Sequence, residues 1–241
     1  IGFDKSAGSF LFTDVVHYDG LMHEMERNLS LLKVFGINSN VNEYPRLFLS
    51  PHDRQQIDLL ISEFGTQHDN SMIGIAPGSV WNTKRWLKER FIELIQKLTE
   101  TNFNVILIGG TEDIDLCEEI KTNVSIKKVF SASGKLSLLQ SAELIRRCRL
   151  LVSNDSAPMH LAVSVGTPVV AIFGATDPKF GFAPYGVSDI IVETKGLSCR
   201  PCSIHGGKRC PIRTFDCMKL ISANDVYDKV INLIKSVPVK I

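Results

Sequence analysis

A short polar turn, Asn154-Asp155-Ser156, carries side chains that could hold an anion. It lies between an apolar run and a predicted helix that contains His160. Neither this run nor the one at 169–173 alternates with polar residues, so we expect two strands of a parallel sheet that is covered on both faces. The turn then follows the carboxyl end of a strand, where open α/β sheets bind ligands.

The start of the predicted helix offers a place for phosphate. We expect Asp155 or Ser156 to cap it, with Pro158 in the first turn. The remaining free amides and the Ser156 hydroxyl could bind a phosphate group, and His160 could reach the same anion. An ordinary capped helix without a ligand explains the same residues, so the hypothesis depends on what other turns bring to this edge.

A second turn, between residues 77 and 86, supplies a cation. Gly78 would let the backbone approach a ligand closely, Ser79 could donate a hydrogen bond, and Lys84 is the positive charge that a phosphate site needs. The spacing of a P-loop is absent. The alternative interpretation is that Lys84 and Arg85 are solvated surface charges.

Two further turns complete the candidate site. Glu112 follows Gly109-Gly110 and could bind a ribose diol, although it could also favour a helix start. The Gly-x-Gly-x-x-Gly spacing is absent, so a nicotinamide or flavin fingerprint is unsupported. Leu136 could form one wall of a base pocket or belong to the core. Since all these turns follow strands, a parallel sheet would gather them on one edge.

Strands and helices are predicted to alternate regularly from residue 72, which indicates a doubly wound parallel sheet. The predicted strands are 72–76, 104–108, 127–130, 150–154, 169–173 and 189–193; helices are expected at 88–101, 112–122, 137–147, after the turn at 154–156, and at 222–236. Two earlier helices are expected at 23–36 and 51–64. A polar joint at 68–71 is the predicted boundary between a first domain, 1–68, and a second, 69–241.

The composition of the 241 residues is that of a globular protein, with 44% apolar and 22% charged residues. The net charge of +1 gives no reason to expect nucleic acid binding. We find no run long enough for a membrane span and no signal peptide at the start. Because the chain opens on Ile1 rather than Met, we interpret it as a fragment or a processed form.

Four of the six cysteines lie close together, at Cys199, Cys202, Cys210 and Cys217. The Cys-x2-Cys pair resembles half of a zinc site, but the other two thiols do not form the second close pair of a zinc ribbon. A structural zinc and reduced, unliganded thiols are the two interpretations. Catalysis by such a metal is not expected, since four thiolates leave no open position.

Three segments together resemble glycosyltransferase family 9, the ADP-heptose:lipopolysaccharide heptosyltransferases and their relatives. They are Pro77-Gly78-Ser79 with Lys84-Arg85-Trp86, Ser153-Asn-Asp-Ser-Ala-Pro-Met-His160, and residues 169–178; His23-Glu-x-x-Arg27-Asn28-Leu29 also resembles the family. The resemblance covers nearly the whole chain. It implies a GT-B architecture, in which two Rossmann-like domains enclose the reaction, with residues 1–68 the remnant of the acceptor-binding domain.

The resemblance also implies roles. Residues at the diphosphate would be Ser79, Lys84, Ser156, Ala157 and His160, with Glu112 at the ribose, Leu136 at the adenine and Asp155 as the acid of its turn. Lys84 and Asp155 are the catalytic candidates. Heptose or a similar sugar would pass with inversion from a nucleotide-diphosphate donor, with ADP-heptose the expected one, to a lipopolysaccharide inner-core acceptor. No cofactor would be needed, and the reaction would take place in the cytoplasm or at the cytoplasmic face of the inner membrane.

Two departures and one gap accompany the resemblance. Leu87 stands where many relatives have Pro, and Ala157 where Gly is common. The catalytic carboxylate that would deprotonate the acceptor is expected in the part of the family that precedes residue 1, so this chain alone is expected to be inactive. The alternatives are another GT-B transferase with a different nucleotide, or a catalytically silent nucleotide-binding module.

Overall fold

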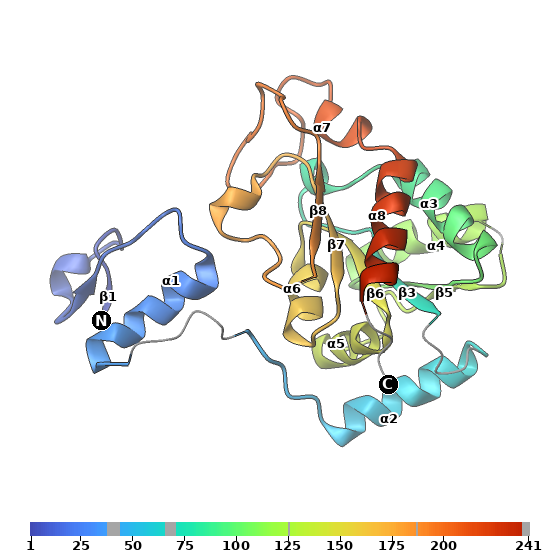
Figure 1. Cartoon of the computed structure of the whole chain (residues 1–241), viewed down its shortest axis with the longest axis horizontal. Coiled ribbons are helices and arrows are strands. Elements are labelled where there is room, and N and C mark those ends of the chain that lie inside the picture. Colours follow the sequence, from blue (N-terminus) through green and yellow to red (C-terminus); the bar gives the residue numbers. More distant parts are fainter. Residues whose placement is uncertain (38–43, 66–70, 125, 187, 238–241) are drawn as a thin grey trace.

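The computed structural model describes residues 1–37, 44–65, 71–124, 126–186 and 188–237. Six parallel strands form its main sheet, in the order β5-β4-β3-β6-β7-β8 (Figure 1). Their bounds are β3 Met72–Ala76, β4 Asn104–Leu107, β5 Val129–Ser131, β6 Leu150–Asn154, β7 Val169–Phe173 and β8 Ile190–Glu193. Every residue of β3, β6 and β7 is buried. The unbroken apolar runs therefore mark central strands, as the sequence predicted.

Helices cover both faces of this sheet, which gives two hydrophobic cores. One core contains residues of α3 (Lys88–Glu100), α4 (Ile114–Val124) and α8 (Ala223–Ser236), and the other contains residues of α2 (Pro51–Glu63), α5 (Leu138–Arg147) and α6 (Ala157–Ser164). The capping boxes Ser50–Asp53 and Ser222–Asp225 fix the starts of α2 and α8. The arrangement confirms the predicted doubly wound α/β sheet.

The strand order has a switch point at β3 and β6. The chain runs outward from β3 through β4 to β5, then returns to β6 on the other side of β3 and continues to β8. The carboxyl ends of β3 and β6 are therefore neighbours from which the two connections diverge. In doubly wound sheets this divergence opens the crevice in which ligands bind.

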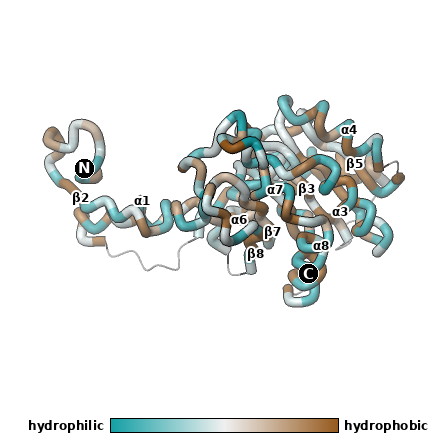
Figure 2. Tube along the Cα trace, turned by 90° about the horizontal axis from the view of Figure 1, so that it is seen from above, coloured by the Kyte–Doolittle hydropathy of each residue, from teal (hydrophilic) through white to brown (hydrophobic). Residues whose placement is uncertain are grey.

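The first residues form a separate small unit at one end of the molecule (Figures 1 and 2). A two-stranded parallel pair, β1 (Gly2–Phe3) and β2 (Val15–Val16), precedes α1 (Glu24–Ser30), and a 3-10 turn then ends at Gly36 with φ 72°. Several of its apolar side chains face solvent, among them Phe10, Leu21 and Phe35. This unit contacts the sheet domain through hydrogen bonds from Glu24 N–H to the Gly181 carbonyl (2.9 Å) and between His23 and the Ala183 carbonyl (2.9 Å).

The predicted boundary at residues 68 and 69 falls within 66–70, outside the described residues, and stays a prediction. Helix α2, which precedes it, nevertheless packs into the core of the sheet domain through Ile57 and Ile61, and the Phe64 ring stacks on Phe130 at 4.8 Å. The core therefore includes residues from both sides of the predicted boundary. One short helix, α7 (Asp216–Lys219), was not expected from the sequence. None of the described helices is long and apolar enough to span a membrane.

Candidate nucleotide-binding site

Four turns at the carboxyl edge of the sheet enclose a cavity of about 290 Å³. They follow β3, β4, β5 and β6, so the cavity straddles the switch point. Of the predicted site residues, five line it: Ser79, Glu112, Leu136, Ser156 and Ala157. The expectation that these turns meet on one edge is confirmed.

The Asn154 side chain joins the turns on the two sides of the switch point. Its amide nitrogen donates to the carbonyls of Pro77 (2.8 Å) and Gly78 (3.3 Å), and its Oδ1 accepts from Trp86 N–H (3.0 Å). Asn154 is fully buried, so these bonds are not exchanged with water. They fix the loop that carries Ser79 and Lys84 against the end of β6.

Lys84 and Asp155 form an ion pair beside the cavity. Lys84 Nζ lies 2.7 Å from Asp155 Oδ2, and the two side chains are only 14% and 7% exposed. The same carboxylate oxygen accepts a 2.7 Å hydrogen bond from Thr176 Oγ1. Lys84 therefore lies on the same rim as the Ser156 turn, but it points at Asp155 rather than forming a wall of the cavity.

The start of α6 differs from the expected cap. Ser156 occupies the N-cap position, yet among the described residues no side chain caps it; the Ser156 hydroxyl donates to the Asn154 carbonyl at 3.3 Å. Asp155 is engaged with Lys84 and Thr176 instead. Ser156 is therefore the N-cap residue but makes no capping bond through its side chain, and Asp155 does not cap the helix. Pro158 has no N–H and Met159 N–H donates to the Ser156 carbonyl (3.1 Å), which leaves the Ala157 N–H of the helix start for a ligand at the cavity wall.

The turn after β4 carries two carboxylates, Asp113 and Glu112, in different environments. Asp113 Oδ2 accepts from Gly110 N–H at 3.1 Å, and burial raises the pKa of Asp113 while this hydrogen bond opposes the shift. A Cβ on Gly78 would stand 2.1 Å from Asp113 Oδ1, so the glycine is needed for the approach of Asp113. Glu112 remains exposed at the rim, where a ligand hydroxyl could reach it.

The apolar wall of the cavity comes from several turns. Leu136 lines it beside Leu138 and Val80, and the last two are 64% and 79% exposed. Large apolar side chains with so much exposed surface at a cavity mouth are suited to pack against a planar ligand. Leu136 also packs against the core, so it belongs to the core and lines the cavity; its place at a base stays a prediction.

His160 lies one helical turn inside α6, outside the cavity wall. Loss of solvation lowers the pKa of His160, while the Asp155 carboxylate opposes the shift, and His23 and Lys84 lower the pKa further. The shift favours the neutral imidazole. His23, which belongs to the N-terminal unit, is among the charges that lower the pKa of His160.

The four clustered cysteines are free thiols. Burial raises the pKa of Cys217 to about 11, and burial together with Cys199 raises that of Cys202. Burial also opposes ionisation of Cys210, but backbone hydrogen bonds from residues 212–215 outweigh it and lower its pKa. In the described part of the chain, no three His, Cys, Asp or Glu side chains are grouped so that they could hold a metal ion. The zinc hypothesis has no support from this geometry.

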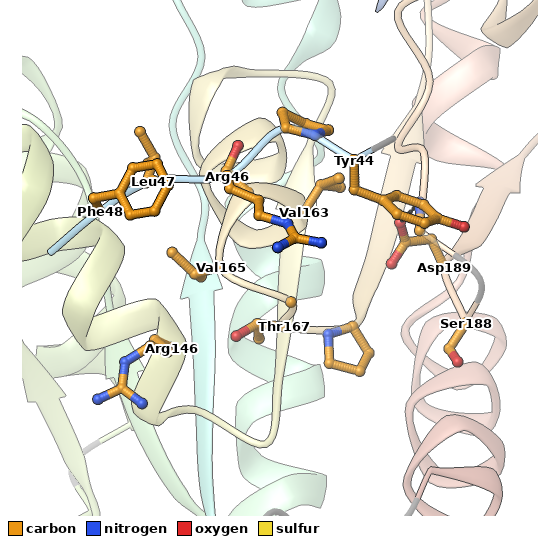
Figure 3. A pocket seen from close by; sticks show the side chains of 15 residues that line it. Tyr44, Arg46, Leu47, Phe48, Arg146, Val163, Val165, Thr167, Ser188 and Asp189 are labelled. Carbon is orange, nitrogen blue, oxygen red and sulfur yellow. Dashed lines mark hydrogen bonds between the residues drawn. The ribbon is translucent and has the colours of Figure 1, made fainter. Parts of the chain in front are cut away.

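A larger cavity, of about 550 Å³, lies at the opposite edge of the sheet (Figure 3). It is formed by residues 44–48 together with the end of α6 and the turns that precede β7 and β8, and Arg46 points into it. The Asp189 carboxylate in its wall accepts from the N–H groups of Val169 (2.9 Å) and Gly186 (2.6 Å). None of the predicted site residues lines it.

Three residues that build the site received no role as organisers of its turns from the sequence: Asn154, Thr176 and Asp113. Asn154 could have been found as a polar residue at the end of a buried strand, where an amide needs partners. Thr176 lies in the turn after β7, and its hydroxyl could be paired with Asp155 only once β6 and β7 were placed side by side.

The sheet order, the cavity at the switch point and the start of α6 define a Rossmann-like domain with a candidate nucleotide-binding crevice. Comparison with known proteins makes this specific. The sequence profile of glycosyltransferase family 9 (heptosyltransferase) matches residues 1–209, so the chain belongs to this family. Lipopolysaccharide heptosyltransferase 2 of Salmonella typhimurium is 28% identical over 163 residues, which are 65% of this chain and 47% of that protein.

Solved structures agree in fold. The glycosyl transferase family 9 protein of Veillonella parvula matches with a TM-score of 0.80 and 24% identity, over 94% of this chain and 64% of that one. The E. coli heptosyltransferase WaaC, solved with ADP, matches with a TM-score of 0.67 and 17% identity, over 93% and 60%. The fold is thus that of the GT-B heptosyltransferases. The chain spans about half the length of the Salmonella relative.

Proposed function

We propose that this chain forms the donor-binding part of an inverting glycosyltransferase. The enzyme moves a heptose or a similar sugar from a nucleotide-diphosphate donor, ADP-heptose, to a lipopolysaccharide core acceptor. The observation that carries the proposal is the cavity at the switch point, with the Lys84–Asp155 pair beside it. The ADP in the WaaC structure and the substrate named for the Salmonella relative support the choice of donor and acceptor.

The lining residues divide into three groups along the cavity. Leu136, with Leu138 and Val80, forms an apolar wall for the base, and Glu112 at the rim binds the ribose hydroxyls. Ser79, Ser156 and the Ala157 amide bind the phosphates, since a helix start attracts anions. His160, one helical turn further along α6, binds the outer phosphate.

The reaction places negative charge on the leaving phosphate. As the acceptor oxygen attacks the anomeric carbon from one face, the bond to the nucleoside diphosphate breaks on the other. Lys84 and the Ala157 amide at the start of α6 stabilise that charge because they are held in position before the reaction begins. A general base from the N-terminal domain accepts the acceptor proton.

Asp155 has a different role from that base. It is 5% exposed, and its Oδ2 is occupied by Lys84 and Thr176. A carboxylate so engaged is suited to orient the Lys84 ammonium rather than to accept a proton from a sugar hydroxyl. Asp155 therefore acts through Lys84 as a positioning residue.

Titration of the chain with ADP, UDP and GDP by calorimetry tests the donor assignment. We expect ADP to bind most tightly. A preference for UDP or GDP would favour another GT-B transferase, and an absence of binding to all three would contradict the proposal. Binding of ADP without sugar transfer, when the chain is joined to a complete acceptor domain, would favour a silent nucleotide-binding module.

The proposal also includes the place in the cell where the enzyme works. The enzyme works in the bacterial cytoplasm, in peripheral contact with the inner membrane that presents its acceptor.

Structural zinc at the four cysteines remains a prediction without geometric support, and no step of the reaction depends on it. Elemental analysis of protein purified without chelator tests it: less than about a tenth of a zinc per chain would favour reduced thiols.

A further inference from the structure

Two buried threonines flank the Lys84–Asp155 pair without lining the cavity. Thr176 is 2% exposed, and its Oγ1 donates to the same Asp155 oxygen that pairs with Lys84. Thr83 is 3% exposed and directly precedes Lys84 in a three-residue 3-10 turn, Asn82–Lys84. Neither threonine lines the candidate cavity, so we expect any effect they have on the reaction to pass through the ion pair.

The turn that carries Lys84 is held by the loop at 206–208. Thr83 N–H donates to the Gly207 carbonyl (3.1 Å), and Thr83 Oγ1 accepts from Gly207 N–H (2.7 Å). The Asn82 amide adds a bond to the Lys208 carbonyl (3.3 Å). A Cβ on Gly206 would lie 3.1 Å from Lys84 Cγ, so the loop packs directly on the aliphatic part of the lysine.

The other end of the same loop holds the turn that carries Thr176. Cys202 N–H donates to the Ala175 carbonyl (2.8 Å), and the Arg200 guanidinium donates to the Thr176 carbonyl (2.8 Å). Arg200 is also fixed to β8 by Glu193 Oε2 at 3.0 Å. Residues 199–208, here called the cysteine loop, therefore connect the turn of Lys84 to the turn of Thr176.

We propose that the cysteine loop positions the Lys84–Asp155 pair for catalysis through its contacts with the turns that carry Thr83 and Thr176. Electrostatic stabilisation of a leaving phosphate depends on groups fixed in place beforehand, and a misplacement of about 1 Å can cost about 10²-fold in rate. Lys84 lies on a turn too short to be rigid by itself. This inference rests on the proposed role of Lys84 at the diphosphate.

The test uses Thr176→Val and Thr83→Val, which remove a hydroxyl and keep the side-chain volume nearly unchanged. The matched control is Thr99→Val in α3: Thr99 is also buried, and its hydroxyl bonds to helix carbonyls at 2.9 and 3.0 Å, far from the site. Each variant is placed in a transfer-competent enzyme that contains this chain. Its kcat, its donor KM and its Tm are measured.

We expect kcat to fall about tenfold in Thr176→Val and several-fold in Thr83→Val, with donor KM changed less than about threefold. Thr99→Val should lose a similar amount of Tm and keep its kcat. Thr176→Ser and Thr83→Ser should restore kcat, because the serine hydroxyl makes the same bond, and they carry the test if a valine variant does not fold.

Lys84→Ala, assayed beside them, distinguishes the two proposals. If Lys84→Ala is impaired while both valine variants match Thr99→Val in kcat, the positioning role is overturned and the role of Lys84 stands. If Lys84→Ala transfers sugar at the normal rate, the role of Lys84 at the diphosphate is overturned and the positioning role with it.

Discussion

Two buried ion pairs in this molecule are built in opposite ways. Glu143 is fully buried in α5 and is bound by Arg146 and Arg147, three and four residues further along the same helix, at 2.6 Å each. Lys84 and Asp155 come from turns 71 positions apart in the sequence and meet only where the carboxyl ends of β3 and β6 adjoin. The first pair is local to one helix and the second exists only in the folded sheet.

Their surroundings differ as well. Arg147 also reaches Asp58 on α2 at 2.8 Å, so the helical cluster joins two helices on the covered face of the sheet. The Lys84–Asp155 pair adjoins a cavity and an uncapped helix start. A buried pair of opposite charges is thus no sign of function by itself. What distinguishes the second is that it lies next to a turn that lines a cavity, where we propose that a ligand binds.

The largest expected effect is that of Lys84→Ala on sugar transfer. Removal of one fixed group that stabilises the transition state costs about 10²–10³ in rate. We expect kcat to fall by that factor in a transfer-competent enzyme that contains this chain. Lys88→Ala is the matched control, since Lys88 pairs with Glu119 at the surface, away from the site. Equal rates of sugar transfer for Lys84→Ala and Lys88→Ala would show that the Lys84–Asp155 pair has no special role in the reaction.

Glu143→Gln should affect stability rather than binding. The substitution leaves Arg146 and Arg147 without their buried counter-charge, which we expect to lower the free energy of unfolding by about 3 kcal/mol, because both arginines can partly regain water. The measurement is urea unfolding at pH 7, with ADP titration of the folded variant. A large loss of ADP affinity with unchanged stability would instead assign a role in ligand binding, and none in stability, to Glu143.

The same residue predicts a dependence on pH. Burial favours a higher pKa for Glu143, but the hydrogen bonds and charges of Arg146 and Arg147 outweigh it and hold the pKa below its usual 4.5. Since the folded-state pKa is the lower one, the contribution to stability is present above about pH 4.5 and is lost as the pH falls through the folded value. The difference between wild type and Glu143→Gln should therefore shrink below pH 4.5; a constant difference down to pH 3 would contradict this.

Asp58→Asn should have the smallest effect. The Asp58 side chain is 48% exposed, so its pair with Arg147 is screened by water. We expect the free energy of unfolding to change by less than about 0.5 kcal/mol. A loss as large as that of Glu143→Gln in the same urea experiment would show that the contact between α2 and α5, rather than the buried glutamate, stabilises the cluster.

Much of the fold could be predicted because its signals are local. The apolar runs at 150–154 and 169–173, Gly36 after its helical segment, and the Ser222–Asp225 capping box each act within a few residues. Alternation of strands and helices then implied that the turns share one edge, and five site residues do line one cavity there. The contacts of α2 were not predictable in this way, since they depend on which face of the sheet the helix covers.

The sequence by itself determined the type and order of the elements, and with them the edge at which Ser79, Glu112, Leu136 and Ser156 meet, because backbone preferences and hydrophobic period operate over short distances. Only the tertiary structure decided that Asp155 binds Lys84 instead of capping α6, and that residues 199–208 connect the turns on either side of that pair. A carboxylate next to a helix start could accept a hydrogen bond from any of several donors. It bonds the donor that the packed sheet brings within hydrogen-bonding distance.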